Sequence, residues 1–321
     1  MMTMKDKTLK IILFILIVFL IIDMVLIIKL GGFKYITKKV SEMKYTISNK
    51  DKHYNDFEDN KALNNKTEDK LIDNEEKLKE ENKSSNIKEI NTASNNYIDD
   101  VSKVLPETLY QWKFYREDHK KIAYLTFDDG PSREATSKIL DILAANNIKA
   151  TFFVLGTSIE RNEKADELLK RMYNEGHTIA NHGYSHNYSL LYPNGIIDVQ
   201  AVIEDMNKNT SILKGILGND FYSRIIRLPG GYYSWKGREE LDIKLKELGL
   251  YQMDWNALNG DADGKSHGKE QFMNNLINTV GDKDIIFVLM HDTDDKKDTV
   301  NGLQEYINFL KSKGFEFRTL K

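Results

Sequence analysis

Short apolar runs alternate with amphipathic stretches from about residue 105 to the end of the chain. In the last amphipathic stretch, Leu303, Tyr306, Ile307 and Leu310 recur at the spacing of one helix face. The apolar runs have the length of buried strands. Strands are therefore predicted at Ile122–Phe127, Ala150–Leu155, Thr178–Ala180, Ile225–Leu228, Tyr251–Trp255, Ile285–Met290 and Phe315–Leu320. Helices are predicted at Glu134–Asn147, Ser158–Asn174, Asp198–Leu217 and Val300–Lys313.

This alternation of strands and helices predicts an α/β fold with parallel strands and right-handed crossovers. Seven strands suit either a barrel or a doubly wound sheet. In both architectures, ligands bind at the carboxyl ends of the strands. The residues that directly follow the apolar runs are therefore the first place to look for chemistry.

A different pattern precedes this domain. The segment Ile11–Ile28 is apolar apart from Asp23 and is long enough for a membrane span. No small-residue cleavage site follows this segment. We expect a cytoplasmic tail at residues 1–10, an uncleaved transmembrane anchor at 11–30 and a charged flexible linker at 31–104. The folded domain is expected at 105–321. Lysines flank the apolar segment on both sides, so their count alone does not orient it.

Composition narrows the possible chemistry. The chain has 321 residues and a formal net charge of −3, which argues against a general nucleic-acid binder. It has no cysteine, so disulfides, thiolate catalysis and cysteine zinc sites are excluded. Any transition metal must be held by carboxylates or by some of the seven histidines.

Polar groups follow five of the predicted strands. They are Asp128-Asp129, "NHGYSH" at Asn181–His186, "RLPGG" at Arg227–Gly231, Asp254-Trp255 and His291-Asp292. In a parallel sheet, these groups would meet at one rim.

His182 and His186 are four residues apart, a spacing that lets both imidazoles share one metal. Two histidines and one carboxylate form a catalytic zinc set with an open position. Asp128 or Asp129 is the nearest candidate for the third ligand. The pair then has a division of labour, in which one carboxylate binds the metal and the other is a general base. The alternatives are a solvated "DGPS" turn and two surface histidines.

The remaining groups each have a structural and a chemical interpretation. His291 is either a satisfied core histidine or a general acid. Arg227 can tether a carboxylate, and the glycines after it can bring a bare N–H close to an oxyanion, although "RLPGG" alone is only a turn. Asp254 is an acid that can orient a base. Trp255 is either an aromatic wall or part of the core.

In this order, the five groups resemble the polysaccharide deacetylase family, also called carbohydrate esterase family 4 or the nodulation-B homology domain. The resemblance runs from about Lys121 to Leu320, and "TFDDGPS" is its most specific motif. The segments "DWNALNGDADGK", "VLMHDT" and "NGLQEYINFLKSKGFEF" are similar to those of bacterial peptidoglycan N-acetylglucosamine deacetylases. The resemblance implies a distorted (β/α)7 barrel.

The resemblance also implies a role for each matching residue. It implies a metal triad of Asp129, His182 and His186, most often holding Zn²⁺, with Co²⁺, Ni²⁺ or Mn²⁺ as alternatives. It implies Asp128 as general base, Arg227 as its tether, Asp254 as the acid that orients the catalytic histidine, and His291 as general acid. It implies Gly230 as the oxyanion N–H and Leu289 as the wall for the acetyl methyl.

Two positions depart from the family pattern. Gly183 stands where serine or threonine is usual, which can alter a hydrogen bond behind the metal ligands. Gly230 stands where an aromatic residue usually follows the proline, which opens the substrate groove. Tyr232, Tyr233 or Trp235 could refill that space, so Tyr232 joins Trp255 among the candidate substrate contacts.

The expected function is metal-dependent removal of N-acetyl groups from the N-acetylglucosamine of peptidoglycan, with release of acetate. Resistance to lysozyme is implied. The chain would then be a single-pass protein of the cell membrane, held by Ile11–Ile28 with its domain outside. The alternatives are another glycan substrate, such as chitin, exported poly-N-acetylglucosamine or O-acetyl xylan, and a catalytically silent glycan-binding protein. The sequence does not indicate an oligomeric state.

Overall fold

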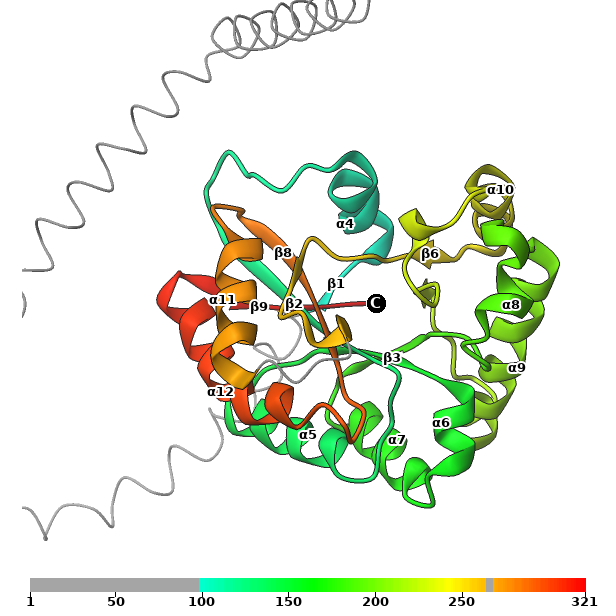
Figure 1. Cartoon of the computed structure of the whole chain (residues 1–321), viewed down its shortest axis with the longest axis horizontal. Coiled ribbons are helices and arrows are strands. Elements are labelled where there is room, and N and C mark those ends of the chain that lie inside the picture. Colours follow the sequence, from blue (N-terminus) through cyan, green and yellow to red (C-terminus); the bar gives the residue numbers. More distant parts are fainter. Residues whose placement is uncertain (1–97, 264–267) are drawn as a thin grey trace, which may run out of the picture. The chain divides into compact units, whose positions relative to one another are not determined.

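The computed structural model describes residues 98–263 and 268–321 (Figure 1). The predicted tail, the anchor at Ile11–Ile28 and most of the predicted linker lie outside these residues. None of the helices in the described part of the chain is long and apolar enough to span a bilayer.

The folded unit begins before residue 105. Strand β1 (Ile98–Asp99) pairs in parallel with β10 (Thr319–Leu320), and helix α4 (Val101–Glu107) follows it. Val101 and Leu105 of α4 are fully buried. The predicted linker therefore extends too far at its carboxyl end, because this short, mostly polar stretch gives little hydrophobic periodicity to read.

The central sheet is parallel throughout, with the order β6-β5-β4-β3-β2-β8-β7. Its strands are β2 (Lys121–Asp128), β3 (Thr151–Val154), β4 (Thr178–Asn181), β5 (Ile225–Ile226), β6 (Tyr251–Gln252), β7 (Ala257–Leu258) and β8 (Ile285–His291). The two end strands, β6 and β7, are not paired with each other, so the sheet is an open half-barrel and not a closed one.

The seven strands of this path differ in one member from the seven predicted. The run Phe315–Leu320 splits into β9 (Phe315–Phe317), which pairs with β2 off the main path, and β10. Its place is taken by β7, which is only two residues long and carries no periodicity. The prediction of a parallel α/β fold is confirmed, but the predicted seven-stranded barrel is not, because the sheet has eight strands when β9 is included and stays open between β6 and β7.

Helices cover the outside of the sheet (Figure 1). The longer ones are α5 (Ala135–Ala145), α6 (Gly156–Arg161), α7 (Ala165–Asn174), α9 (Val199–Leu217), α10 (Arg238–Leu248), α11 (Gly268–Val280) and α12 (Lys297–Ser312). Shorter turns are α8 (Tyr188–Leu191), η2 (Leu109–Gln111), η3 (Pro193–Gly195), η4 (Tyr232–Ser234) and η5 (Asp261–Asp263). The single helix predicted at Ser158–Asn174 is two helices, because Asn162 is extended and its side chain donates to the Pro131 carbonyl.

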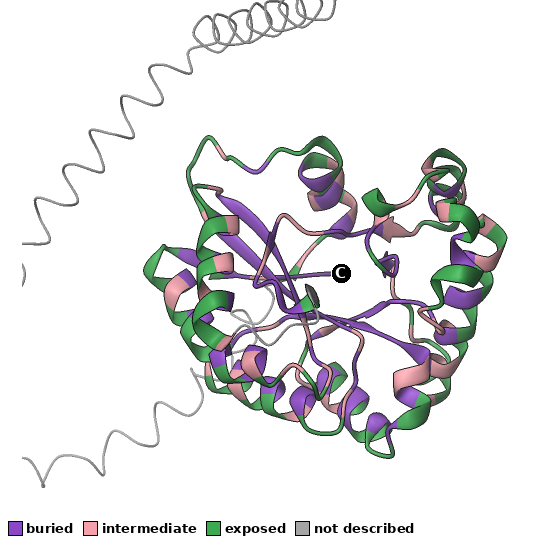
Figure 2. Ribbon diagram, viewed as in Figure 1, coloured by how far each residue is buried: buried purple, intermediate pink, exposed green. Residues whose placement is uncertain are grey.

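Buried residues make up most of the strands and the inner faces of the helices, and exposed residues lie on the outer faces of the helices (Figure 2). Phe127 and Phe152 stack across β2 and β3 with ring centroids 5.2 Å apart. Each such side chain contributes about 1.5–3 kcal/mol on burial. The core thereby fixes the strand register that pairs Asp128 with His291 at the carboxyl ends of β2 and β8.

Candidate functional site

Asp129, His182 and His186 form one cluster at the carboxyl ends of β2 and β4. One ligand atom from each residue lies within 4.8 Å of the other two. The Nε2 atoms of His182 and His186 lie 3.4 and 3.6 Å from Oδ1 of Asp129. The structure thus brings together the three residues that the sequence predicts as metal ligands.

His182 is held in the tautomer that a metal ligand needs. Its Nδ1 lies 2.8 Å from the carbonyl oxygen of Arg227, which can only accept, so Nδ1 carries the hydrogen and Nε2 is free. Burial lowers the pKa of His182 against the raising effect of Asp128 and Asp129. The ring is therefore neutral and presents a lone pair toward Asp129.

Asp129 also fits a cation. Its Oδ1 is buried and has no hydrogen-bond partner among the described residues. Its backbone is left-handed, with φ of 73°, and so is that of His186, with φ of 53°. Strained conformations of this kind persist where the surroundings impose them, commonly at functional sites. One carboxylate and two imidazoles suit a divalent metal with an open position.

Asp205 of α9 holds the loop between the two histidines. Its carboxylate accepts from the backbone amides of Tyr184 at 2.6 Å and of Ser185 at 3.2 Å. Gly183 has φ of +84°, and a Cβ there would lie 2.5 Å from Oδ2 of Asp205. The glycine at this position therefore accompanies a buried acid from another helix. No local pattern in the sequence connects this acid to the two histidines, because it lies 19 residues past His186.

Asp128 is paired with a fully buried arginine. Nη1 of Arg227 lies 2.6 Å from Oδ1 of Asp128 and donates also to Thr126. The guanidinium donates further to the carbonyls of Met253 and Asp254. A buried charge needs such partners. The tether expected between Arg227 and Asp128 is present.

Aromatic rings cover the Arg227 guanidinium. Its Cζ lies 4.0 Å from the centre of the Phe153 ring and 5.5 Å from that of Trp255. Trp255 also packs on Gly231, where a Cβ would lie 2.7 Å from its ring. Trp255 thus packs against the buried Arg227 guanidinium and borders the loop that contains Gly230.

His291 is oriented by Asp261, and the expectation that Asp254 would do so is wrong. Nδ1 of His291 lies 2.7 Å from Oδ1 of Asp261, and its amide donates to Oδ2 of the same carboxylate. Burial opposes the charged ring, but the hydrogen bond and charge of Asp261, with Asp128 and Asp129, raise the pKa of His291 to about 9. Asp261 lies in the "NGDADGK" segment, where its charge and two glycines were the available signal.

Asp254 holds the loop after β5 instead. Its carboxylate accepts from the backbone amide of Tyr232 at 3.1 Å and from the Gln252 side chain. Burial raises the pKa of Asp254, against the opposing hydrogen bond from Tyr232. The reason for the correction is geometric, since Asp254 faces the Tyr232 turn whereas Asp261 is next to the end of β8.

The space beside Gly230 is occupied by two aromatic side chains. A Cβ at Gly230 would lie 3.0 Å from Cζ2 of Trp235 and 3.2 Å from the hydroxyl of Tyr188. The indole of Trp235 stacks on Tyr192 at 4.0 Å, and the Tyr188 ring lies 5.1 Å from His186. Of the residues expected to refill this space, Trp235 does so; Tyr188 does so unexpectedly.

Leu289 and Tyr232 have different surroundings. Leu289 is buried in β8, two residues before His291, so both side chains face the same side of the sheet. The hydroxyl of Tyr232 is hydrogen-bonded to Asp242 of α10, at 2.6 Å from the nearer oxygen. Leu289 is thus placed beside the site, whereas no described contact joins the Tyr232 side chain to the metal ligands.

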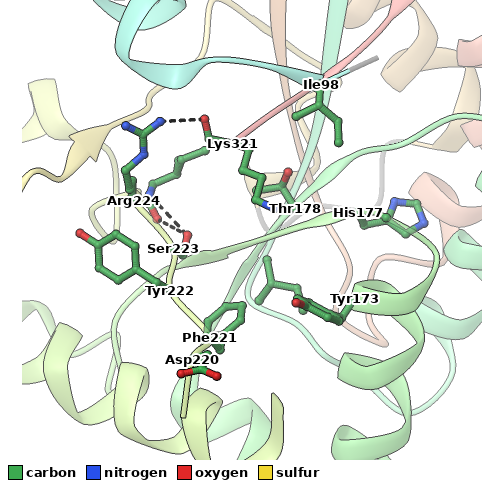
Figure 3. A pocket seen from close by; sticks show the side chains of 13 residues that line it. Ile98, Tyr173, His177, Thr178, Asp220, Phe221, Tyr222, Ser223, Arg224 and Lys321 are labelled. Carbon is green, nitrogen blue, oxygen red and sulfur yellow. Dashed lines mark hydrogen bonds between the residues drawn. The ribbon is translucent and has the colours of Figure 1, made fainter. Parts of the chain in front are cut away.

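A cavity of the folded unit lies away from this cluster. It has a volume of about 730 Å³ and lies where β4 and β5 begin (Figure 3). Its lining includes Tyr173, Phe221, Arg224 and Lys321, and none of the predicted site residues. Because ligands of this fold class bind at the opposite ends of the strands, this cavity is not the candidate site.

Comparison with known proteins agrees with this geometry. Residues 115–249 match the family model described as polysaccharide deacetylase. A peptidoglycan-N-acetylglucosamine deacetylase of Bacillus cereus is 33% identical over 217 residues, covering 66% of this chain and 71% of the relative. A CE4 esterase structure from Streptococcus mutans is 35% identical, with a TM-score of 0.63 over 70% of this chain and 92% of that one. The catalytic domain of a peptidoglycan N-acetylglucosamine deacetylase from Eubacterium rectale is 32% identical, with a TM-score of 0.56 over 65% of this chain and 92% of that one.

Proposed function

Because the chain belongs to the polysaccharide deacetylase family and is a hydrolase of glycan amide bonds, we propose that it removes acetyl groups from the N-acetylglucosamine of peptidoglycan. The relative from Bacillus cereus and the Eubacterium rectale structure, both named for this substrate, support the choice of glycan. The single observation that carries the proposal is the placement of Asp128 between the metal ligands and Arg227.

Asp129, His182 and His186 would hold the metal, for which we propose Zn²⁺. When bound, a divalent ion supplies a Lewis acid that polarises the acetyl carbonyl and lowers the pKa of water. Oδ2 of Asp128 lies 3.8 Å from Nε2 of His182, so this carboxylate borders the same space.

The protein's own groups divide the proton transfers. Asp128 accepts a proton from the attacking water, and its hydrogen bond to Arg227 orients it for this role. The backbone N–H of Gly230 donates to the carbonyl oxygen as negative charge develops, an interaction typically worth about 2.7–4 kcal/mol. His291, protonated at neutral pH, donates its proton to the leaving nitrogen. Acetate and a glucosamine with a free amine are the products.

We also propose the cellular setting predicted from sequence. Ile11–Ile28 would anchor the chain in the cell membrane, and the charged segment after it would carry the domain into the wall. A wall with free amines would resist lysozyme.

Acetate release from purified peptidoglycan by the full chain tests the proposal. We expect the unmodified chain to release acetate, a chelator to abolish this release and added Zn²⁺ to restore it. The variants Asp128→Asn and His182→Ala should release no acetate. His119→Ala is the matched control, since this histidine is exposed and far from the cluster in sequence. Unchanged release in the two site variants would refute the mechanism. Faster release from chitin oligomers or acetylated xylan than from peptidoglycan would instead refute the choice of substrate.

A further inference from the structure

A second cavity, of about 430 Å³, lies along the free edge of β6. We call it the tyrosine pocket, after four of its lining residues: Tyr110, Tyr232, Tyr233 and Tyr251. They come from η2, η4 and β6, and α10 closes the remaining side. We propose that the tyrosine pocket is a second glycan-binding site, which holds the polymer beside the catalytic centre. This inference rests on the proposed glycan substrate.

The pocket continues into an exposed aromatic surface. Trp112 is 54% exposed and Tyr233 is 49% exposed, and their ring centroids lie 5.4 Å apart. Tyr110, at 43%, is exposed as well. Contiguous exposed rings of this kind mark binding surfaces. Tyrosine and tryptophan present an apolar face together with a polar edge, which suits a sugar ring that has C–H faces and hydroxyl edges.

The charges of the pocket favour a neutral ligand. Asp242 and Lys246 both line it and lie one turn apart on α10. The carboxylate of Asp242 accepts from the Tyr232 hydroxyl at 2.6 Å and keeps capacity for further donors. One negative and one positive group side by side do not select for phosphate or nucleic acid. They offer an acceptor and a donor for sugar hydroxyls and amides.

The free edge of β6 is not open to pairing with a further strand. The hydroxyl of Tyr110 donates to the carbonyl of Gln252 at 2.9 Å and so covers the edge where a strand would add. The pocket is therefore suited to a ligand that contacts side chains.

The pocket is joined to the catalytic centre by a short stretch of backbone. Tyr232 follows Gly230 by two positions, and its amide is fixed by the carboxylate of Asp254. A glycan chain that passes Gly230 during hydrolysis can therefore continue onto Tyr233 and Trp112. The site would add affinity for long chains without touching the reacting acetyl group.

The test compares a polymer with a short substrate, using the full chain. Trp112→Ala and Tyr233→Ala alter exposed rings on two different elements, so a folding defect common to both is not expected. Tyr173→Ala is the matched control, because this exposed tyrosine lies in the other cavity. Binding is measured by co-sedimentation with insoluble peptidoglycan, and kinetics with peptidoglycan and with a short N-acetylglucosamine oligomer.

We expect the affinity of each variant for peptidoglycan to fall about fivefold or more. The KM of each variant for the polymer should rise by a similar factor. kcat/KM for the short oligomer should stay unchanged, as should all properties of Tyr173→Ala. Unchanged binding by both variants, or an equal loss on the short oligomer, would overturn the proposal. If the unmodified chain sediments with the glycan but releases no acetate, the proposed function fails while the binding site stands or falls on the two variants alone.

Discussion

The Nδ1 atom of His291 lies 2.7 Å from Oδ1 of Asp261, and the hydroxyl of Thr299 donates to the other oxygen of that carboxylate at 2.7 Å. The contact fixes the ring of His291, since Nδ1 points at the acid and Nε2 lies 4.0 Å from Oδ2 of Asp129. A pair of this kind keeps the imidazole protonated and ready to donate from Nε2.

The first prediction concerns the titration of His291. Its pKa is raised to about 9, above the usual value for histidine, so the ring is charged at neutral pH and loses its proton as pH rises through about 9. Asp261→Asn removes the charge that supports the imidazolium and should lower this pKa. We expect NMR titration of the metal-free protein to show this lower pKa of His291. The alkaline limb of the kcat profile should move to lower pH.

Asp254→Asn is the control for this prediction. Asp254 contacts the Tyr232 amide, so its substitution should leave the titration of His291 nearly unchanged. A shift in Asp254→Asn as large as in Asp261→Asn would mean that Asp254 orients the histidine after all.

The second prediction concerns the buried pair of Arg227 and Asp128. Arg227→Met leaves the Asp128 carboxylate without its partner in the interior, and removing one member of a buried pair costs about 3–5 kcal/mol of unfolding free energy. Denaturant unfolding measures this loss, and activity should disappear with it. Arg224→Met is the matched control, because Arg224 pairs at the surface and its loss should cost far less. Equal losses in the two variants would contradict the pairing described here.

The sequence predicted the parts of this molecule that local pattern encodes. Apolar runs located β2, β3, β4 and β8, and the rule that ligands bind at strand ends selected the Asp128-Asp129 pair and the two histidines, among which the family resemblance chose Asp129 as the ligand. Prediction from sequence failed for residues whose contact partner is distant in the chain and whose own segment shows no hydrophobic periodicity.

Asp261 illustrates this failure. Asp261 reaches His291 because η5 lies against the end of β8. The charged sequence around Asp261 does not predict this tertiary contact. Strand β7 was missed for a related reason, since two residues show no period and are strand only through pairing with β8.

The third prediction concerns Gly230. Gly230→Ala places a Cβ 3.0 Å from Trp235 and 3.2 Å from the Tyr188 hydroxyl, at a φ of +78° that costs about 1–2 kcal/mol for a non-glycine residue. Displacement of either ring would move the Gly230 amide, which we propose donates to the substrate carbonyl, so kcat should fall together with stability.

Gly195→Ala separates the two effects. Gly195 has φ of +75° and nothing within 4 Å of a new Cβ, so it bears the same backbone cost without the collision. We expect similar thermal destabilisation in both variants and a loss of kcat in Gly230→Ala alone. Full activity in Gly230→Ala would show that the aromatic packing does not set the position of this amide.

The fourth prediction is that the triad couples metal binding to stability. A metal that binds only the folded state adds about 2.7 kcal/mol to the unfolding free energy at about 100 times its Kd. Zn²⁺ should therefore raise the Tm of the chelator-treated protein and of His119→Ala, and should leave that of His186→Ala unchanged. A rise in His186→Ala equal to that of the unmodified chain would place the metal elsewhere.

The last prediction concerns Asp205, which holds the loop between the metal-binding histidines. Asp205→Ala frees the amides of Tyr184 and Ser185, so His182 and His186 lose their fixed separation and zinc affinity should fall by about 10–100-fold. Competition with a chromophoric chelator measures this affinity. Asp198→Ala is the control, since Asp198 caps the same helix by accepting from the Ala201 amide at 3.0 Å and contacts no part of the loop. Both variants should lower Tm, but only Asp205→Ala should weaken zinc binding, because the Asp205 carboxylate, unlike that of Asp198, is bonded to the loop between the two ligands. Equal zinc affinities would show that the loop keeps its shape without this acid.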